Sequence, residues 1–341
     1  MSQKKLPLGD ISVNFVNSVA ATLKQLKTPH AELLDYFSLT PAFLNTPDAR
    51  ISIPRFMRLG HEAIRLSRTP HFGLIMGTNM RVSDVGLAGF AAMVAPNLET
   101  SLQTLIEFET LSSRNSRGHS RCYMQDQRLV SEFYSISPYN QYNYFVVDSM
   151  LSTWFEISLW LTGRADLLHH VEVEYSNQHY IDAYESRFQC PVYFGRHRNA
   201  LVFKKGAERS PVRYANQANF ITMRTLCAQE RERLTKVQTH KDRVTELIGT
   251  LLTGSPPKIE DIAEKMGMAG WTLRRRLKEE GVKYHLILDE TREALAKTYV
   301  ADTNHNFTEI AFLLGFSSPA AFQRAFKRWT GLSPGEYRRQ Q

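Results

Sequence analysis

The sequence is poor in cysteine. Its 341 residues include three cysteines, Cys122, Cys190 and Cys227, which lie far apart and have no paired spacing. An odd number of cysteines without paired spacing argues against both a disulfide framework and a zinc site. We therefore interpret the three thiols as buried and reduced, and we expect neither a metal nor another cofactor.

Long hydrophobic runs are also missing. The apolar stretch Gly86–Ala95 is broken by Pro96, well short of the ~20 residues that a bilayer span requires. The segment Met1–Asp10 contains two lysines but no apolar run of the kind found in signal peptides. We expect a cytoplasmic protein without a membrane partner.

Motifs that carry enzyme chemistry are absent as well. The chain has no G-x-S-x-G elbow, no phosphate-binding glycine loop and no H-E-x-x-H pair. His169 and His170 precede a strand-like run, which suits a surface turn better than metal ligation. These absences argue against an enzyme.

The chain is rich in apolar residues and has an excess of basic ones. With 43% apolar residues, a chain of this length predicts two packed domains. The net charge of +8 favours an anionic partner. Within Lys241–Gln341, however, 16 basic and 13 acidic residues leave a net charge of only +3, so the clustering of the basic residues matters more than their number.

The N-terminal two thirds of the chain alternates between helical and strand-like patterns, which predicts an α+β domain. Apolar spacing predicts helices over Ile11–Leu26, Ile53–Arg68, Leu98–Ser112 and Asp148–Leu161. Strands are predicted over Arg121–Gln125, Arg128–Ile136, His170–Tyr175, Pro191–Phe194 and Ala200–Phe203.

A long helical stretch, Asn216–Gln238, follows and is either a domain linker or a dimer helix. Breakers cluster next, at Thr253–Pro257, and the pattern beyond them is helical almost to the end. We expect an N-terminal domain over residues 1–235, with a helical linker over 215–240, and an all-α C-terminal domain over 241–341.

The C-terminal region contains an internal repeat. The pattern Ile259-x-x-Ile262-Ala263-x-x-Met266-Gly267 recurs 48 residues later, from Phe307 to Gly315. In each copy a second helical segment follows the glycine. A helix, a glycine turn and a second helix form a helix-turn-helix, so we predict two such units, Ile259–Glu280 and Phe307–Trp329.

The second helix of each unit must bury one face, which leaves the opposite face for the major groove of DNA. With Leu273 and Leu277 inward, helical periodicity places Trp271, Arg274, Arg275 and Lys278 outward in the first unit. In the second unit, Phe322 and Phe326 point inward. The outward residues expected there are Ser318, Ala320, Gln323, Arg324, Lys327 and Arg328. We predict these ten residues to contact double-stranded DNA.

A single helix over Lys283–Val300 should join the two units. Its length of roughly 27 Å is near the ~34 Å pitch that separates successive major-groove faces. One chain is therefore expected to cover two adjacent half-sites, with Leu288, Leu295 and Tyr299 packing against both units.

The second unit strongly resembles the signature of AraC/XylS-type transcriptional regulators. The residues that carry the resemblance are Phe307–Ala311, Gly315–Ser318, Phe322–Trp329 and Gly331–Arg338. The resemblance covers about the last hundred residues and implies a seven-helix DNA-binding domain with two DNA-reading helices. The first unit departs from it at Lys258 and Ala269, where small polar caps are usual, so its reading helix is expected to begin loosely. Trp271 then either touches DNA or packs in the turn.

The N-terminal domain resembles the ligand-binding domain of the branch that contains ornithine-utilisation regulators. The matching segments are Phe72–Gly77, Gly86–Gly89 and Arg187–Phe194. This resemblance implies effector binding and dimerisation, without specifying the effector. The aromatic and polar segment around Tyr139, Tyr142 and Tyr144 is a candidate for the ligand site, with plain core as the alternative. Trp154 and Trp160 are interpreted as core residues.

Taken together, the sequence predicts a DNA-binding transcriptional regulator, an activator controlled by a small-molecule effector. Its expected partners are promoter DNA, RNA polymerase and a second copy of the chain. One alternative is a constitutive regulator whose N-terminal domain only dimerises. Another is an alkyl-transfer enzyme fused to a DNA-binding domain, with Cys190 as its nucleophile, although no basic residue near Cys190 favours activation of that thiol.

Overall fold

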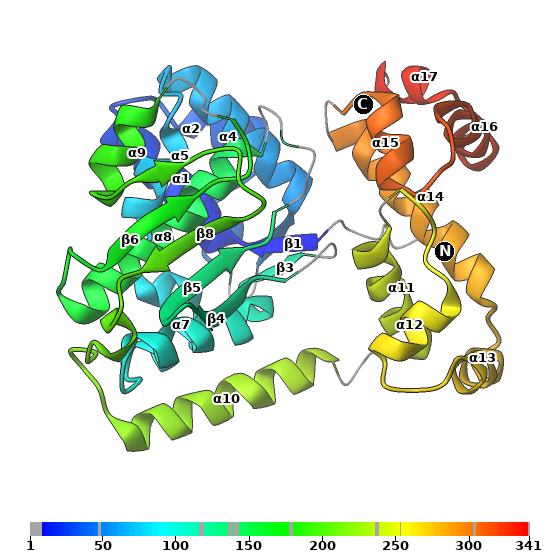
Figure 1. Ribbon diagram of the computed structural model, residues 1–341. Coiled ribbons are helices and arrows are strands. Elements are labelled where there is room, and N and C mark those ends of the chain that lie inside the picture. The colour runs from blue at the N-terminus through cyan, green and yellow to red at the C-terminus, as the bar shows by residue number, and fades with distance from the viewer. Residues whose placement is uncertain are drawn as a thin grey trace.

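The computed structural model describes residues 9–46, 49–115, 119–135, 139, 143–176, 180–235, 239–252, 254–302 and 305–339. Figure 1 shows a domain of mixed helices and strands and a smaller helical domain, with the helix α10 leading from one to the other. Separate hydrophobic clusters fill the two domains. The predicted fold class, α+β followed by all-α, is confirmed.

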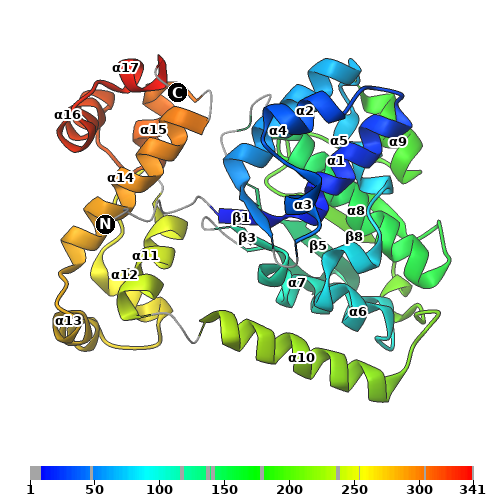
Figure 2. The same ribbon diagram turned by 180° about the vertical axis from the view of Figure 1, so that it is seen from behind.

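A five-stranded sheet forms one layer of the N-terminal domain, and helices pack on one of its faces (Figures 1 and 2). Its strand order is β4–β5–β8–β6–β7, with all neighbours antiparallel except β6 and β7. The bounds are β4 Arg121–Gln125, β5 Arg128–Phe133, β6 Leu168–Glu172, β7 Val192–Tyr193 and β8 Asn199–Phe203.

The sequence predicted all five of these strands, with errors at their ends. β4 has the predicted bounds, whereas β5 ends at Phe133, before the predicted end at Ile136, which lies outside the described residues. β6 begins at Leu168 instead of His170, because an irregularity in the ladder between these two residues still allows Leu168 to pair with Phe203.

A second, three-stranded sheet was not predicted. It has the order β2–β1–β3 and consists of β1 (Gly9–Ser12), β2 (Arg50–Ser52) and β3 (Ser113–Asn115). β1 takes Ile11 from the predicted first helix, which instead begins at Val13. Gly9 is required in this sheet, because it has a φ of 131° and an added Cβ would lie 2.0 Å from the carbonyl oxygen of Arg114.

The helix α8 (Tyr144–Thr162) runs through the middle of the N-terminal domain and packs directly against α5 (Phe72–Thr78). Gly73 and Gly77 lie one turn apart on the face of α5 that meets α8. A Cβ on Gly73 would lie 2.5 Å from the carbonyl oxygen of Phe145, and one on Gly77 would collide with α8 in the same way. The close packing of these two helices therefore requires glycine.

The other helices of this domain surround that pair, and α4 has nearly the predicted bounds. The predicted helix Leu98–Ser112 is divided into α7 and a short 3-10 turn, η2. The bounds are α1 Val13–Gln25, α2 Ala31–Tyr36, α3 Pro41–Leu44, α4 Ile53–Ser67, η1 Val82–Val85, α6 Leu87–Met93, α7 Leu98–Glu107, η2 Glu109–Leu111, α9 Ile181–Phe188 and η3 Ala207–Arg209.

The helix α10 (Gln217–Thr235) lies along the base of the N-terminal domain, where it contacts α6 and η2 (Figure 1). Its inner face buries Cys227, and Arg224 forms an ion pair with Glu107 at 2.6 Å. The outer face exposes Ile221, among other residues. None of the described helices, including the long α8 and α10, combines the length and apolar character needed to cross a bilayer.

The C-terminal domain is built from helices among its described residues, with one isolated β-bridge residue at Ser255. A single hydrophobic cluster draws on residues from Val244 to Phe326 and fills it. The helices are α11 His240–Leu251, α12 Ile259–Lys265, α13 Gly270–Glu279, α14 Tyr284–Asp302, α15 Phe307–Leu313, α16 Pro319–Thr330 and α17 Pro334–Arg339.

Asp148, on α8, is a completely buried carboxyl group within the N-terminal core. It accepts hydrogen bonds from the hydroxyls of Tyr175, Tyr180 and Tyr184, the one from Tyr180 at 3.0 Å. Burial raises the pKa of Asp148 to about 6, although the three hydroxyls partly offset the shift. The native core therefore favours the protonated form more than water does.

Replacing Asp148 by Asn should flatten the pH dependence of stability. The native carboxyl keeps its proton up to about pH 6, whereas the unfolded chain loses it near 3.8, so wild-type stability falls as pH rises through this interval. This difference in pKa corresponds to a loss of about 3 kcal/mol in the free energy of unfolding of the wild type. The amide in Asp148→Asn does not ionise, so the variant should not show this loss. Urea unfolding between about pH 4 and about pH 7 measures the difference. Asp182→Asn, at an exposed position of α9, is the matched control, and equal pH slopes for Asp148→Asn and wild type would disprove the assignment.

Candidate nucleic-acid interface and ligand cavity

The first predicted helix-turn-helix unit is formed by α12 and α13. The chain turns between them at Gly267, which has a φ of 69°. Leu273 and Leu277 of α13 are buried in the C-terminal cluster, as predicted. The residues expected to face outward, Trp271, Arg274, Arg275 and Lys278, are all exposed.

The second unit is formed by α15 and α16, with a turn at Gly315, which has a φ of 64°. Phe322 and Phe326 are fully buried. Ser318 is half-buried because its hydroxyl caps α16 by accepting a hydrogen bond from the backbone N–H of Ala321. The other residues predicted to face outward, Ala320, Gln323, Arg324, Lys327 and Arg328, are exposed.

The helix α14 joins the two units, one residue shorter at its start and two longer at its end than predicted. Leu295 and Tyr299 are buried in the shared cluster, and Leu288 packs partly buried against it. Near its start, the Tyr284 hydroxyl donates to the carbonyl oxygen of Pro257, just before α12. Both units are therefore attached to the same helix.

Arg292, in the middle of α14, holds the turn of the second unit. Its guanidinium donates to the carbonyl oxygens of Leu314 at 2.9 Å and Gly315 at 2.7 Å, at the end of α15. It also lies over the ring of Phe316, 4.7 Å from the centroid. Sequence reasoning missed this residue, because an arginine on a helix surface carries no local sign of a partner in a later turn.

The two outward-facing helices, α13 and α16, lie at opposite ends of α14 (Figure 1). Both are seen nearly end-on in that view, and both lie on the side of the C-terminal domain away from the N-terminal domain. Figure 2 shows the same arrangement from behind. Their exposed faces can therefore meet one extended partner on that side.

The cations of the two outward faces differ in their partners. Arg274 forms an ion pair with Glu260 of α12 at 2.6 Å, whereas Arg324 and Lys327 have no ion-pair partner among the described residues. Trp271 is 65% exposed, with Arg275 over its ring, so it does not pack in the turn. The first face is thus tied to carboxylates of its own helices, whereas on the second face, within the part of the chain that the structure describes, only Arg328 has a carboxylate near it, Asp289 of α14 at 3.9 Å.

The starts of the two reading helices also differ. Ala269 precedes α13 without a side-chain cap, as its sequence predicted, whereas Ser318 caps α16. Before α12, the backbone N–H of Lys258 donates to the carboxylate of Asp261 at 2.8 Å, which supplies part of a cap. Asn306 and Glu309 form a reciprocal capping box before α15.

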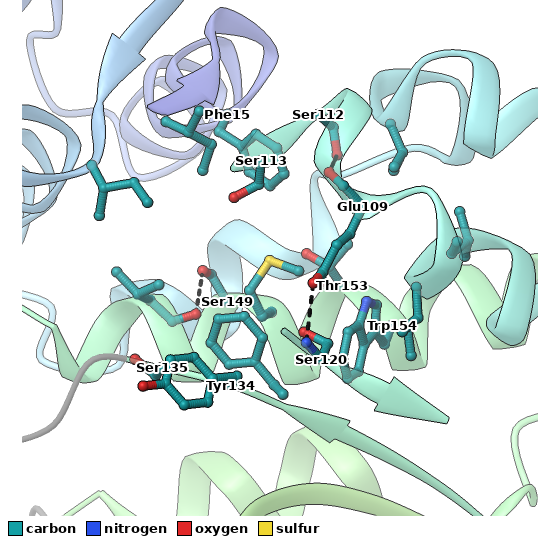
Figure 3. A pocket seen from close by; sticks show the side chains of 18 of the residues that line it. Phe15, Glu109, Ser112, Ser113, Ser120, Tyr134, Ser135, Ser149, Thr153 and Trp154 are labelled. Carbon is teal, nitrogen blue, oxygen red and sulfur yellow. Dashed lines mark hydrogen bonds between the residues drawn. The ribbon is translucent and has the colours of Figure 1, made fainter. Parts of the chain in front are cut away.

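A cavity lies within the N-terminal domain, between the three-stranded sheet with α1 and α4 on one side and α7, α8 and β5 on the other (Figure 3). It leaves about 80 Å³ of free space. Its lining is apolar and aromatic with several hydroxyls. The apolar lining residues are Ile11, Phe15, Ile53, Phe56, Met57, Val85, Leu105, Ile106, Phe133, Val146, Met150, Trp154 and Ile157.

This cavity follows a seam in the core. Phe15 and Phe56 belong to one hydrophobic cluster, Ile53 and Met57 to a second, and Trp154 to a third. Clusters that pack internally but meet across a cavity can separate more readily than a continuous core. The cavity therefore lies where the three clusters meet.

A larger, polar cavity of about 680 Å³ adjoins the first one, since Val85 and Ser112 line both. Its walls include Arg50 and Arg114 of the three-stranded sheet. The last turns of α10 close it with Glu230, Arg233 and Leu234. The end of the helix that leads to the C-terminal domain therefore rests near both cavities.

Two of the three tyrosines predicted as ligand contacts, Tyr139 and Tyr144, lie outside both cavities. Tyr139 donates a hydrogen bond to Glu174, and its ring packs against those of Tyr144 and Tyr175. Tyr142 lies outside the described residues. Tyr139 and Tyr144 form an aromatic cluster and line neither of the two cavities.

The two tryptophans of α8 differ in burial, and two of the three cysteines are half-buried. Trp154 is buried and lines the apolar cavity, whereas Trp160 is 39% exposed, so its interpretation as a core residue was wrong. Cys190 is half-buried, not buried as predicted, and so is Cys122. Burial raises the pKa of the Cys190 thiol to about 11, which opposes a role as a nucleophile.

Two helix-turn-helix units at the ends of one helix, joined to an α+β domain with an internal cavity, define a DNA-binding transcription regulator. Residues 29–212 match the arabinose-binding domain of AraC transcription regulators, an N-terminal domain, and residues 262–340 match a helix-turn-helix domain. The chain belongs to the AraC family of transcription regulators. The resemblance seen in the sequence is confirmed, and so is the prediction that the chain is not an enzyme, because this family is not enzymatic.

The chain matches its relatives over nearly their whole length. It is 25% identical to the ornithine utilization regulator of Pseudomonas aeruginosa, over 96% of each chain. It is 25% identical to the transcriptional regulator VirS of Mycobacterium tuberculosis, over 93% of this chain and 92% of that one. The crystal structure of the transcriptional regulator CdpR from Pseudomonas aeruginosa covers 93% of this chain and 97% of its own, with 22% identity and a TM-score of 0.43.

The caps of the reading helices should respond oppositely to substitution. Ser318→Ala removes the cap of α16 and should lower the free energy of unfolding of the C-terminal domain by about 1 kcal/mol. Ala269→Ser supplies a cap to α13 and should raise it by a similar amount. Urea unfolding of the full chain measures both, with Ser317→Ala as the control at an exposed neighbouring position. A lower free energy of unfolding in Ala269→Ser would show that a serine at this position does not cap α13.

Proposed function

We propose that this regulator covers two adjacent half-sites of promoter DNA with one monomer, and that a small-molecule effector in the N-terminal domain controls this binding. The observation that carries the proposal is the position of α13 and α16 at opposite ends of α14, on the same side of the C-terminal domain. The 19 residues of α14 span about 28 Å, near the ~34 Å pitch between successive major-groove faces.

In the first half-site, α13 enters the major groove. Arg274 and Arg275 reach base edges, where guanidinium groups pair best with guanine, and Lys278 meets a phosphate. Arg274 must exchange Glu260 for DNA, which costs little because both side chains are more than half exposed. Trp271, exposed at the start of the helix, contacts a sugar or a thymine methyl group.

In the second half-site, Gln323 and Arg324 of α16 read base edges, and the small Ala320 allows close approach to a thymine methyl group. Lys327 and Arg328 contact phosphates. The Ser318 hydroxyl, which accepts the capping hydrogen bond, still has its proton to donate to a phosphate oxygen. Because α16 is capped and its cations Arg324 and Lys327 have no ion-pair partner among the residues that the structure describes, it supplies the pre-ordered half of the interface.

The effector acts through α4 and α10. Ile53, Phe56 and Met57 of α4 line the apolar cavity, and α4 also contacts α14. A ligand that widens the cavity displaces α4 and changes its contact with α14. The last turns of α10, beside the adjoining polar cavity, lead into the linker to the C-terminal domain.

We take residues 1–235 and 241–341 as the two functional units and propose a homodimer formed through α10. The outward face of α10 exposes Ile221 and Leu226, apolar residues that a second copy can cover. DNA on the side of α13 and α16 leaves the opposite side of the regulator accessible. Contact of that side with RNA polymerase would make the protein an activator.

A constitutive regulator with a purely dimerising N-terminal domain is the second candidate. The small volume of the apolar cavity, about 80 Å³, favours it, because ligand pockets commonly enclose ~300–1,000 Å³. The seam between the hydrophobic clusters favours the effector instead, since it lets the cavity expand on binding.

Substitutions on the two reading helices should separate base contacts from phosphate contacts. Arg274→Ala and Gln323→Ala should relax base preference, each costing about 1–3 kcal/mol at one operator position. Lys327→Ala should weaken binding to all sequences and reduce the salt dependence by about one unit of slope. Anisotropy titrations against the operator and its point variants, over a range of salt concentrations, measure both effects.

The control for these titrations is Arg276→Ala, since Arg276 lies 3.5 Å from Glu279 on α13 and is not assigned to DNA. It should leave base preference unchanged. If the double variant Arg274→Ala, Arg324→Ala gives the wild-type footprint, the groove assignment is wrong.

Filling the apolar cavity should abolish the response to an effector. A panel of amino acids, amines, sugars and lipids should include a compound that raises the melting temperature of the wild type, by about 5 °C at a concentration of roughly 100 Kd. In Ser149→Leu, the added side chain occupies the cavity and this shift should be lost. Differential scanning calorimetry measures both proteins.

Ser186→Leu, the same change at an exposed position of α9, should respond like the wild type. Circular dichroism of Ser149→Leu checks that the variant is folded. A panel without any stabilising compound would favour the constitutive alternative.

A further inference from the structure

Glu109 is the one charged side chain among the described residues that line the apolar cavity. It stands at the start of η2, and its side chain is 24% exposed. One carboxylate oxygen, Oε1, accepts a hydrogen bond from the backbone N–H of Ser120 at 3.0 Å. His119 Nδ1 lies 3.7 Å from the same oxygen, with a side chain that is mostly exposed.

The second carboxylate oxygen, Oε2, accepts no hydrogen bond from the described residues. The hydroxyls of Ser120 and Thr153, which line the same cavity, likewise lack a described partner. Figure 3 shows the Glu109 carboxylate beside Ser120, with Thr153 toward the same end of the cavity. This polar end therefore offers three acceptor oxygens, one of them charged.

A primary ammonium group matches these three acceptors, because it carries one positive charge and three N–H donors. The ring of Trp154 also lines this region, and aromatic rings attract cations. A ligand carboxylate would instead be repelled by Glu109, with little water inside an apolar cavity to screen the charge. The electrostatics of the cavity therefore select against anions.

The rest of the lining selects an apolar body. Phe15, Phe133 and Met57 present hydrocarbon surface and no polar group. A sugar ring or the carboxylate of an amino acid would lose its hydration against these residues without gaining hydrogen bonds. The free space of about 80 Å³ is less than the ~150 Å³ of a cavity that holds benzene, so the body is either short or inserts by widening the seam.

Ser135 gives an independent sign of a missing partner. Ser135 lines the cavity, and its buried hydroxyl has no hydrogen-bond partner among the described residues. In Figure 3 it lies on the opposite side of the cavity from Glu109. Buried hydroxyls normally form a hydrogen bond. The Ser135 hydroxyl would gain one if the bound ligand carries a polar atom at the end away from Glu109.

We propose that the apolar cavity binds a primary amine with an apolar body, its ammonium group held by Glu109, Thr153 and Ser120. This assignment rests on the proposed function in placing the effector in the N-terminal domain, and it specifies the chemical class. An amine that extends to Ser135 gains one further hydrogen bond there.

The test uses matched head groups on identical chains. Butylamine, butanol and butyrate, and their octyl counterparts, are titrated into the full-length protein by isothermal calorimetry. The amine should bind about tenfold more tightly than the alcohol, and the carboxylate should bind least. Glu109→Gln keeps the shape and the acceptor for Ser120 but removes the charge, so it should weaken amine binding about tenfold and alter alcohol binding less than about twofold.

Glu185→Gln, at an exposed position of α9, makes the same charge change away from the cavity and should bind like the wild type. Tighter binding of the alcohol or the carboxylate, or equal amine affinity in Glu109→Gln and wild type, would overturn the proposal, as would the absence of binding by every amine. Amine binding without any change in operator affinity would support the ligand class and contradict effector control. If a ligand of another chemical class changes operator affinity, effector control is supported and the assignment of an amine is contradicted.

Discussion

The guanidinium of Arg292, on α14, donates hydrogen bonds to the carbonyl oxygens of Leu314 and Gly315 and lies over the ring of Phe316. These carbonyls end α15 and have no partner in the next turn of a helix, so a donor from another helix is needed to satisfy them. Since that donor comes from α14, the turn of the second unit is held to the helix that also contacts the first. The helix α14 thus holds segments of both units, beside Pro257 near its start and at Leu314 and Gly315 near its middle.

The N-terminal domain, in contrast, has a core that is not continuous. Its core is divided into clusters, and the apolar cavity lies between them. The helix α4 contributes to the wall of the cavity and to the contact with α14. The helix α4 therefore connects the wall of the apolar cavity to the DNA-binding domain, whereas the helices of the α5–α8 pair are close-packed and touch through glycine.

The success of prediction from sequence differed between elements for physical reasons. The helix-turn-helix units were predicted because the apolar period of a helix is local and because the pattern occurs twice. The sheet β2–β1–β3 was missed because strands of three or four residues are too short to show alternation, and their partners are distant in the sequence. Tyr139 and Tyr144 were selected for their composition, but they pack with Tyr175, whose proximity no local pattern shows.

By itself, the sequence determined the family, the two reading helices and their outward faces, since each follows from residues a few positions apart on one helix. Only the tertiary structure decided that Arg274 pairs with Glu260, that Arg292 holds the second turn, and that a cavity exists. Phe15, Glu109 and Trp154 come from separate parts of the chain and line one space because α1, η2 and α8 pack around it. A cavity is a property of such long-range packing, so the chemistry that Glu109 can perform there was not visible in the order of the residues.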